Sequence, residues 1–224
     1  MKGNKMDIGF LAEEPVFNTK LKLTITPLAP LSMVSELPGS YYHSNLMPTE
    51  NMIFGLIENM IYFHFSDEIR NSIIKAVKKA AKKKKWETTD FHSSGSKYKS
   101  IFQKHIRITD IKTPEKKVVF QDLWSQHLKR ADDGHYNGSR NYDWRLENSY
   151  DKLTEKQRIR YYPYYYISPT NREYIIYNEP IIVLIETKKE INDVLLGYSQ
   201  NPAAPLYLGS NDGWVEVNAE ALDE

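Results

Sequence analysis

The pattern of residues 21–26 predicts the first strand of the fold; the stretch is Leu21-Lys22-Leu23-Thr24-Ile25-Thr26. Apolar side chains occupy every second position here, and lysine or threonine stands between them. A period of two residues is typical of a strand that buries one face in a core and turns the other toward solvent. We therefore expect a half-buried strand over residues 20–28.

Two helical patterns follow a loop that contains prolines and a glycine (residues 30–48). Apolar residues between Ile53 and Ile61 recur at the spacing of one helix face, and Thr49 precedes them in the position of an N-cap. A second pattern begins at Ile69 and runs into Lys82-Lys83-Lys84-Lys85. The spacing predicts two amphipathic helices, the second of which ends in a basic cluster.

The C-terminal part has a similar order of elements. A β-prone stretch begins at Tyr174, and its nearly continuous apolar run, Ile181–Ile185, predicts a central strand covered on both faces. Residues 188–198 have the apolar spacing of a short helix. Residues 205–209 favour a strand that ends in a glycine turn, and Trp214–Val217 favours a last short strand.

The middle of the chain, residues 86–172, differs from the parts on either side. Short alternating pieces are separated by clusters of glycine, asparagine, aspartate and serine, which favour hairpins and loops. The order of elements predicts an α+β fold, with a ferredoxin-like βαββαβ core and a large inserted β-hairpin region. We expect one domain over residues 1–224, whose core covers approximately residues 18–85 and 173–218.

The composition excludes several classes of protein. None of the 224 residues is cysteine, which removes disulfide frameworks, thiolate zinc sites and cysteine nucleophiles. No run of about 18 apolar residues is present, so no membrane span is expected. Residues 1–10 lack the basic start and long apolar run of a secretory signal, and a cytoplasmic location is the expectation. No nucleotide-binding or metalloprotease motif occurs, and no metal or cofactor is expected.

Charge is distributed unevenly along the chain. The formal net charge is only +1, but residues 75–160 contain 22 Lys and Arg against 11 Asp and Glu. The remaining residues contain 8 basic and 18 acidic side chains. A polyanion responds to such a local excess at short range, so the basic part is a candidate for nucleic-acid binding. Plain solvated surface is the alternative interpretation.

Flat side chains and cations occur together in the inserted region, where ten of the 16 tyrosines lie between Tyr136 and Tyr177. Single-stranded RNA is held by cations along its phosphates and by flat side chains on which its bases stack. Packing between strands is the alternative use of such tyrosines. The candidates for RNA contact are Arg140, Arg145, Arg158, Arg160 and Tyr161, together with Lys97, Lys99 and Lys104 in a preceding stretch that contains glycine and serine.

The basic cluster at residues 82–85, with Lys75, Lys78 and Lys79 before it, permits two interpretations. A helix dipole favours cations at the C-terminal end, so a solvated helix end is the first. A patch that binds phosphates without sequence preference is the second.

Two segments carry a resemblance to a known family. One is the chain from Leu21 to Ile61, where Pro48-Thr49 precedes a helix with Phe54-Gly55-Leu56-Ile57; the other is Asn201-Pro202-Ala203-Ala204-Pro205-Leu206-Tyr207-Leu208-Gly209-Ser210. Together they resemble the Cas-five type of CRISPR-associated protein, a branch of the RAMP superfamily. The loop at residues 36–43 departs from the family, which typically has a run of prolines there.

This resemblance implies an RRM-like palm, a thumb formed by residues 86–172, and a non-catalytic function. The function is to grip the 5′ handle of crRNA in a type I Cascade surveillance complex, a part of antiviral defence. The implied partners are crRNA, the backbone and large subunits of Cascade and, indirectly, target DNA. By analogy with the family, the loop with Tyr41, Tyr42 and His43 lies near the handle, and the free amides of the helix that Thr49 caps are suited to a phosphate.

Two other functions stay open at this point. Some members of the family cut precursor RNA without a metal, which requires a general base, a general acid and a cation. His43, His105, His127 and His135 are residues of a suitable type, but their spacing does not assemble a site. Asp132-Asp133-Gly134 before His135 indicates a turn rather than a metal site. The third function is that of a soluble α+β binding domain unrelated to nucleic acid.

Overall fold

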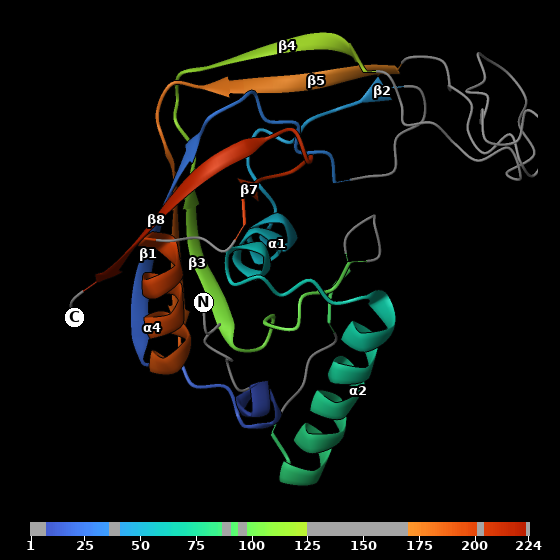
Figure 1. Ribbon diagram of the computed structural model, residues 1–224, viewed down its shortest axis with the longest axis vertical. Helices are drawn as coiled ribbons and strands as arrows, with labels where there is room; N and C mark the ends of the chain where they lie inside the picture. Colours follow the sequence, from blue (N-terminus) through green and yellow to red (C-terminus); the bar gives the residue numbers. More distant parts are fainter. Residues whose placement is uncertain are drawn as a thin grey trace, which may run out of the picture. The chain divides into compact units, whose positions relative to one another are not determined.

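A computed structural model describes residues 8–35, 41–86, 91–93, 98–124, 170–200 and 204–222 of the chain. These ranges contain both helices and strands (Figure 1). In chain order they are the 3-10 helix η1 (Ile8–Ala12), β1 (Thr19–Pro27), β2 (Tyr41–Tyr42), α1 (Glu50–Met60), α2 (Asp67–Lys84), β3 (Ile106–Lys112), β4 (Lys117–Trp124), β5 (Thr170–Tyr177), β6 (Ile181–Thr187), α4 (Lys189–Gln200), β7 (Leu206–Tyr207) and β8 (Trp214–Leu222).

Five strands form an antiparallel sheet in the order β3-β6-β1-β8-β7. β1 pairs with β6 on one side and with β8 on the other, and Leu23 lies opposite Val183. The alternation of β1 places Leu21, Leu23 and Ile25 on one face, where each of them is 0% exposed. The half-buried strand predicted for residues 20–28 is confirmed.

β6 is the central strand that its apolar run predicts, because it pairs with both β1 and β3. Every second residue from Ile181 to Thr187 is buried, whereas Ile182 and Leu184 stay partly exposed. On this second face the partner of Leu184 in β1 is Lys22, a charged residue. The expectation that β6 is covered on both faces is therefore wrong, since only one of its faces is fully buried.

Two β–α–β connections order the sheet. β1 leads through α1 and α2 to β3, and β6 lies between these two strands. β6 leads through α4 to β8, and β1 lies between them. The α+β class is confirmed, and this strand order is compatible with the ferredoxin-like core that the sequence predicts.

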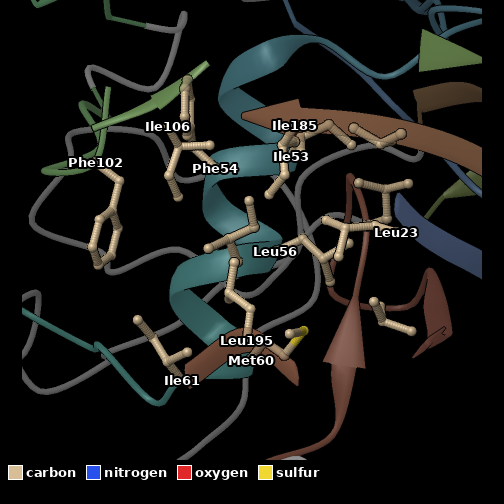
Figure 2. Packing of buried hydrophobic residues seen from close by; sticks show 14 of the residues in the cluster. Leu23, Ile53, Phe54, Leu56, Met60, Ile61, Phe102, Ile106, Ile185 and Leu195 are labelled. Carbon is tan, nitrogen blue, oxygen red and sulfur yellow. The ribbon is translucent and has the colours of Figure 1, made fainter. Parts of the chain in front are cut away.

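α1 begins where the sequence predicts and supplies much of the core. The hydroxyl of Thr49 accepts a hydrogen bond from the amide of Met52 at 3.4 Å and caps the helix. Figure 2 shows the apolar side of α1 packed among residues of the sheet and of α4, with Met60 beside Leu195. Each such fully buried side chain contributes about 1.5–3 kcal/mol to folding.

α2 is capped by Ser66, whose hydroxyl accepts a hydrogen bond from the amide of Ile69 at 3.4 Å. The helix packs on η1 and buries Ile74 and Val77, while its other side is exposed. It ends at Lys84, so the second helix predicted from the sequence is confirmed. Among the described residues, no helix is long and apolar enough to cross a membrane.

The strand and glycine turn predicted at residues 205–209 are present. β7 ends at Tyr207, and Gly209 follows with a φ of 79°. A Cβ at this position would collide with the carbonyl oxygen of Ser32. That oxygen also accepts a hydrogen bond from the amide of Ser210 at 3.0 Å. The turn therefore requires glycine for its backbone conformation and for the close approach of a second chain segment.

A second sheet has the order β2-β5-β4, with β2 parallel to β5. The chain divides into two compact units, the first with residues 1–38, 43–120 and 173–224 and the second with residues 39–42 and 121–172. β3 falls within the range predicted for the insertion, and it forms an edge of the five-stranded sheet in the first unit. The division into a palm and a thumb stays a prediction.

Candidate nucleic-acid interface

A pocket of about 540 Å³ opens at the N-terminal end of α1. The chain before β1, the turn before β3 and β3 itself form its other walls. Its polar lining consists of Thr49, Glu50, Asn51, His92, Gln103, Lys104 and Arg107, and its apolar lining of Pro15, Phe17, Phe54, Ile106 and Ile108. The lining is thus mixed, with slightly more polar than apolar residues, and it offers hydrogen-bonding groups beside apolar surface.

The first turn of α1 faces this pocket. Unpaired amides at the start of a helix and the positive end of its dipole favour an anion. Thr49 satisfies one of these amides, that of Met52. Glu50, also in the first turn, adds a negative charge that opposes anion binding. The helix end alone therefore does not define the charge of the pocket, to which two basic side chains of the lining also contribute.

Lys104 and Arg107 are these two basic side chains. The ammonium of Lys104 lies 5.3 Å from the centroid of the Phe91 ring. The guanidinium of Arg107 stacks over Phe17 at 4.0 Å and donates a hydrogen bond to Glu186 at 3.1 Å. A cation over an aromatic face is stabilised by about 0.5–1 kcal/mol at an exposed site. The two ring contacts therefore restrain the positions of both head groups. The side chain of Arg107 is 56% exposed, and its guanidinium keeps donors that the Glu186 bond does not use.

Gln103 connects two parts of the pocket lining by hydrogen bonds. Its amide nitrogen donates to the side-chain oxygen of Asn51 at 3.0 Å and to the carbonyl of His92 at 2.6 Å. Its amide oxygen accepts from the backbone amide of His92 at 2.9 Å. One side chain thereby joins the start of α1 to residues 91–93, and it leaves amide groups of Asn51 at the pocket for hydrogen bonds to a ligand.

A buried ion pair anchors the chain that leads to Lys104. Arg70 donates to Glu58 at 2.6 Å and to the backbone carbonyl of Lys99 at 3.3 Å. The other oxygen of Glu58 accepts from the hydroxyl of Ser100 at 2.6 Å and from the amide of Ile101 at 3.0 Å. The predicted contact residue Lys99 is thus held through its backbone beside α1 and α2.

Tyr98 lies next to this ion pair. The guanidinium of Arg70 is 4.8 Å from the centroid of its ring. Burial first, and then the negative charge of Glu58, raise the pKa of Tyr98 far above its ordinary value. The phenol is therefore neutral at any physiological pH and is a packing residue, not an acid or a base.

His105, one of the four histidines considered for catalysis, is a structural residue. It is 2% exposed, its Nε2 lies 3.2 Å from the carbonyl oxygen of Leu11, and Phe10 contacts its ring edge-on at 5.5 Å. Burial lowers the pKa of His105, although the bond to Leu11 raises it in part. A neutral imidazole that donates to Leu11 follows from this environment.

Tyr41, Tyr42 and His43 do not line the pocket. In the second unit, Tyr41 and Tyr42 form β2, and the guanidinium of Arg172 lies 5.1 Å from the ring centroid of Tyr42. In the first unit, His43 lies 3.4 Å from a carboxylate oxygen of Glu173, and its side chain is 75% exposed. These three residues are therefore not part of the lining that contains Thr49 and Lys104.

The pocket brings together two of the predicted contact residues, Thr49 and Lys104. The remaining polar residues of its lining, among them Gln103 and Arg107, were not predicted as contacts. Arg107 stands between Ile106 and Ile108 in an alternating stretch, which signals an outward cation, but nothing in the sequence shows what it faces. Six predicted contacts lie outside the described residues: Lys97, Arg140, Arg145, Arg158, Arg160 and Tyr161.

Comparison with solved structures gives matches of low sequence identity. One similar chain belongs to "Cryo-EM structure of the Type III-B Cmr-beta bound to cognate target RNA and AMPPnP, state 1", with 11% sequence identity and a TM-score of 0.39. The match covers 91% of this chain and 63% of that chain, so the protein spans less than two thirds of its neighbour's length. No curated protein matches the chain.

Comparison with family models gives a match over almost the whole chain. The model described as CRISPR-associated protein Cas5p matches residues 6–219. This range includes both segments that carry the resemblance seen in the sequence, residues 21–61 and 201–210, and the resemblance is confirmed. The chain therefore belongs to the family of CRISPR-associated protein Cas5p.

Proposed function

We propose that this protein is an RNA-binding subunit of a type I CRISPR Cascade surveillance complex and that it holds the 5′ handle of crRNA without performing chemistry. Membership of the Cas5p family supports the proposal. The observation that carries it is the pocket that Lys104 and Arg107 line together with the first turn of α1. Its other partners are the backbone and large subunits of Cascade and, indirectly, target DNA, in the cytoplasm.

The chemistry of the pocket fits a nucleotide of a single strand. Lys104 and Arg107 are suited to a phosphate, because cations form the strongest hydrogen bonds with anionic oxygens. Asn51 is suited to the polar edge of a base, and the apolar side chains of Phe54 and Ile106 to its face. A volume of about 540 Å³ lies within the range of about 300–1,000 Å³ that ligand pockets have.

The test is binding of a labelled RNA oligonucleotide of about eight nucleotides, taken from the 5′ part of the repeat, measured by fluorescence anisotropy. The variant Lys104→Gln/Arg107→Gln is expected to bind at least about tenfold more weakly than the wild type, because two charge-assisted hydrogen bonds are lost. The control Lys112→Gln/Lys116→Gln removes two exposed lysines that do not line the pocket. The proposal fails if the wild type does not bind the RNA, or if the pocket variant and the control variant lose the same amount of RNA affinity.

The thumb-like part of the proposal rests on residues outside the described ranges. Lys97, Arg140, Arg145, Arg158, Arg160 and Tyr161 remain proposed RNA contacts. Tyr41, Tyr42 and His43 remain proposed contacts as well, although they do not line the pocket. Crosslinking of bound RNA and identification of the crosslinked peptides separates these two groups from the pocket residues.

A further inference from the structure

One side of α2 carries an unusual density of cations. Its buried residues are Arg70, Ile74, Val77 and Ala81, which face the core and η1. Figure 1 shows α2 beside η1 and away from the five-stranded sheet. Six lysines of the helix are exposed, and five of them lie on one side of it. We call these five the α2 lysine face: Lys75, Lys78, Lys79, Lys82 and Lys83.

The stability of the helix does not account for these lysines. Lys75 and Lys79, Lys78 and Lys82, and Lys79 and Lys83 are like charges four residues apart. Each such pair destabilises a helix by roughly 0.2–0.5 kcal/mol. The helix dipole compensates only cations of the last turn, Lys82, Lys83 and Lys84. Lys75, Lys78 and Lys79 lie before that turn, where the helix dipole contributes little to the stabilisation of a cation.

Acidic neighbours do not account for Lys75, Lys79, Lys82 or Lys83 either. Within the described ranges, no ion pair involves Lys75, Lys79 or the lysines of the last turn, 82–84. The acidic residues of α2, Asp67 and Glu68, lie in its first turn, at the other end of the helix. The face is therefore a positive surface about 12 Å long, at about 1.5 Å per residue from Lys75 to Lys83.

This surface is continuous with the pocket through one aromatic ring. Phe91 is 5% exposed, and two ammonium groups lie near its ring centroid, that of Lys78 at 5.9 Å and that of Lys104 at 5.3 Å. Lys78 belongs to α2, and Lys104 lines the pocket. Two cations from separate elements thus share one ring, and the positive surface extends from the pocket onto the helix.

We propose that the α2 lysine face binds the phosphates of the RNA strand whose nucleotide occupies the pocket, and that it does so without reading the bases. This inference rests on the proposed function. Lysine is a flexible point charge, which suits phosphates and lacks the planar fork that reads base edges. α2 contains no aromatic residue on which a base would stack. The strand that it binds is therefore free to vary in sequence, in contrast to the nucleotide in the pocket.

The test compares three forms of the full-length protein. The first is the wild type, and the second is an α2 variant with glutamine at four exposed positions, Lys75→Gln, Lys79→Gln, Lys82→Gln and Lys83→Gln. The third is a matched control that removes the same charge from exposed lysines elsewhere, Lys20→Gln, Lys112→Gln, Lys116→Gln and Lys189→Gln. A fourth form with arginine at the four α2 positions restores the charge and is expected to bind as the wild type does. Circular dichroism at the assay temperature verifies that each form is folded.

Each form is titrated with the short RNA that fills the pocket and with the same RNA extended by about ten nucleotides, in two unrelated extension sequences. The α2 variant is expected to lose the affinity that the extension adds, to the same extent for both sequences, and to bind the short RNA as the wild type does. Its slope of log K against log salt for the long RNA is expected to fall by about 3, from about 0.7 for each of four lost phosphate contacts. The control is expected to keep the wild-type slope.

The outcomes separate the two proposals. If the wild type binds neither RNA, the proposed function fails, and this inference fails with it. If the wild type binds RNA but the α2 variant keeps its affinity and salt slope, only the inference fails. An equal loss in the matched control, or a loss with duplex DNA and none with extended RNA, overturns the inference as well.

Discussion

Glu58 and Arg70 form an ion pair with 2.6 Å between Oε2 and Nη1, and their side chains are 3% and 9% exposed. Ser100 and Ile101 donate to the other carboxylate oxygen, so the charge of Glu58 is satisfied on both sides. Burial of an ion pair is tolerated only with such additional hydrogen bonds. The pair joins α1, α2 and residues 99–101, which precede Lys104 in the chain.

Replacement of Arg70 by methionine is expected to lower the free energy of unfolding by about 3–5 kcal/mol, because it leaves the carboxylate of Glu58 buried and unpaired. The matched control is Arg107→Met. Arg107 also pairs with a carboxylate, that of Glu186, but its side chain is 56% exposed, and we expect a loss of at most about 1 kcal/mol. Urea unfolding followed by tryptophan fluorescence measures both. Similar losses for the two variants contradict this account of the pair.

Two glycines are expected to respond to alanine in opposite directions. Gly209→Ala places a Cβ against the carbonyl of Ser32 at a φ of 79°, and a loss of about 1–3 kcal/mol in unfolding free energy is expected. Gly197 lies inside α4, and a Cβ there meets nothing within 4 Å. Gly197→Ala is expected to stabilise the protein by about 0.5–1 kcal/mol, because glycine is the weaker helix former. Thermal unfolding measures the stability of both variants against the wild type. A Gly209→Ala protein as stable as the wild type would count against the turn described above.

His105 is expected to make the protein sensitive to mild acid. Burial lowers its pKa below the ordinary 6.5 in the folded state, so the unfolded chain binds the proton first as the pH falls. Stability is therefore unaffected above about pH 6.5 and falls below it, by up to about 1.4 kcal/mol per pH unit until the folded pKa is reached. The variant His105→Gln keeps a hydrogen-bond donor for the carbonyl of Leu11, but its amide does not gain a proton as the pH falls. Urea midpoints at about pH 7.5 and 5.5 are expected to differ more for the wild type, and parallel profiles would refute this role.

RNA cleavage is expected to be absent. Labelled repeat RNA incubated with the purified protein and a chelator should stay intact on a denaturing gel, since binding alone is proposed. Cleavage under these conditions would instead favour the metal-independent endoribonuclease. His92→Ala and His43→Ala then distinguish a pocket site from the loop site, because His92 lines the pocket and His43 does not.

Local patterns were enough to predict most of the elements of the first unit. The alternation of β1, the capped helix after Thr49, the amphipathic α2 and the glycine turn at 209 each follow from a few neighbouring residues. Their signals are periodicity, capping and backbone freedom, which depend on short stretches of chain. The one-sided burial of β6 was missed, because an apolar run does not show which neighbours lie on its second face.

The family was thus determined by the sequence itself, through residues 21–61 and 201–210, and the α+β class through the order of the predicted elements. The pocket was decided only by tertiary structure, because its walls come from the start of α1, from residues 91–93 and from β3, which are far apart in the chain. Lys104 and Thr49 are 55 positions apart, and no local pattern reports that they share a cavity. The sequence gives the type of each side chain. Which residues that side chain contacts depends on packing in the folded protein, to which residues distant in the sequence contribute as much as near ones.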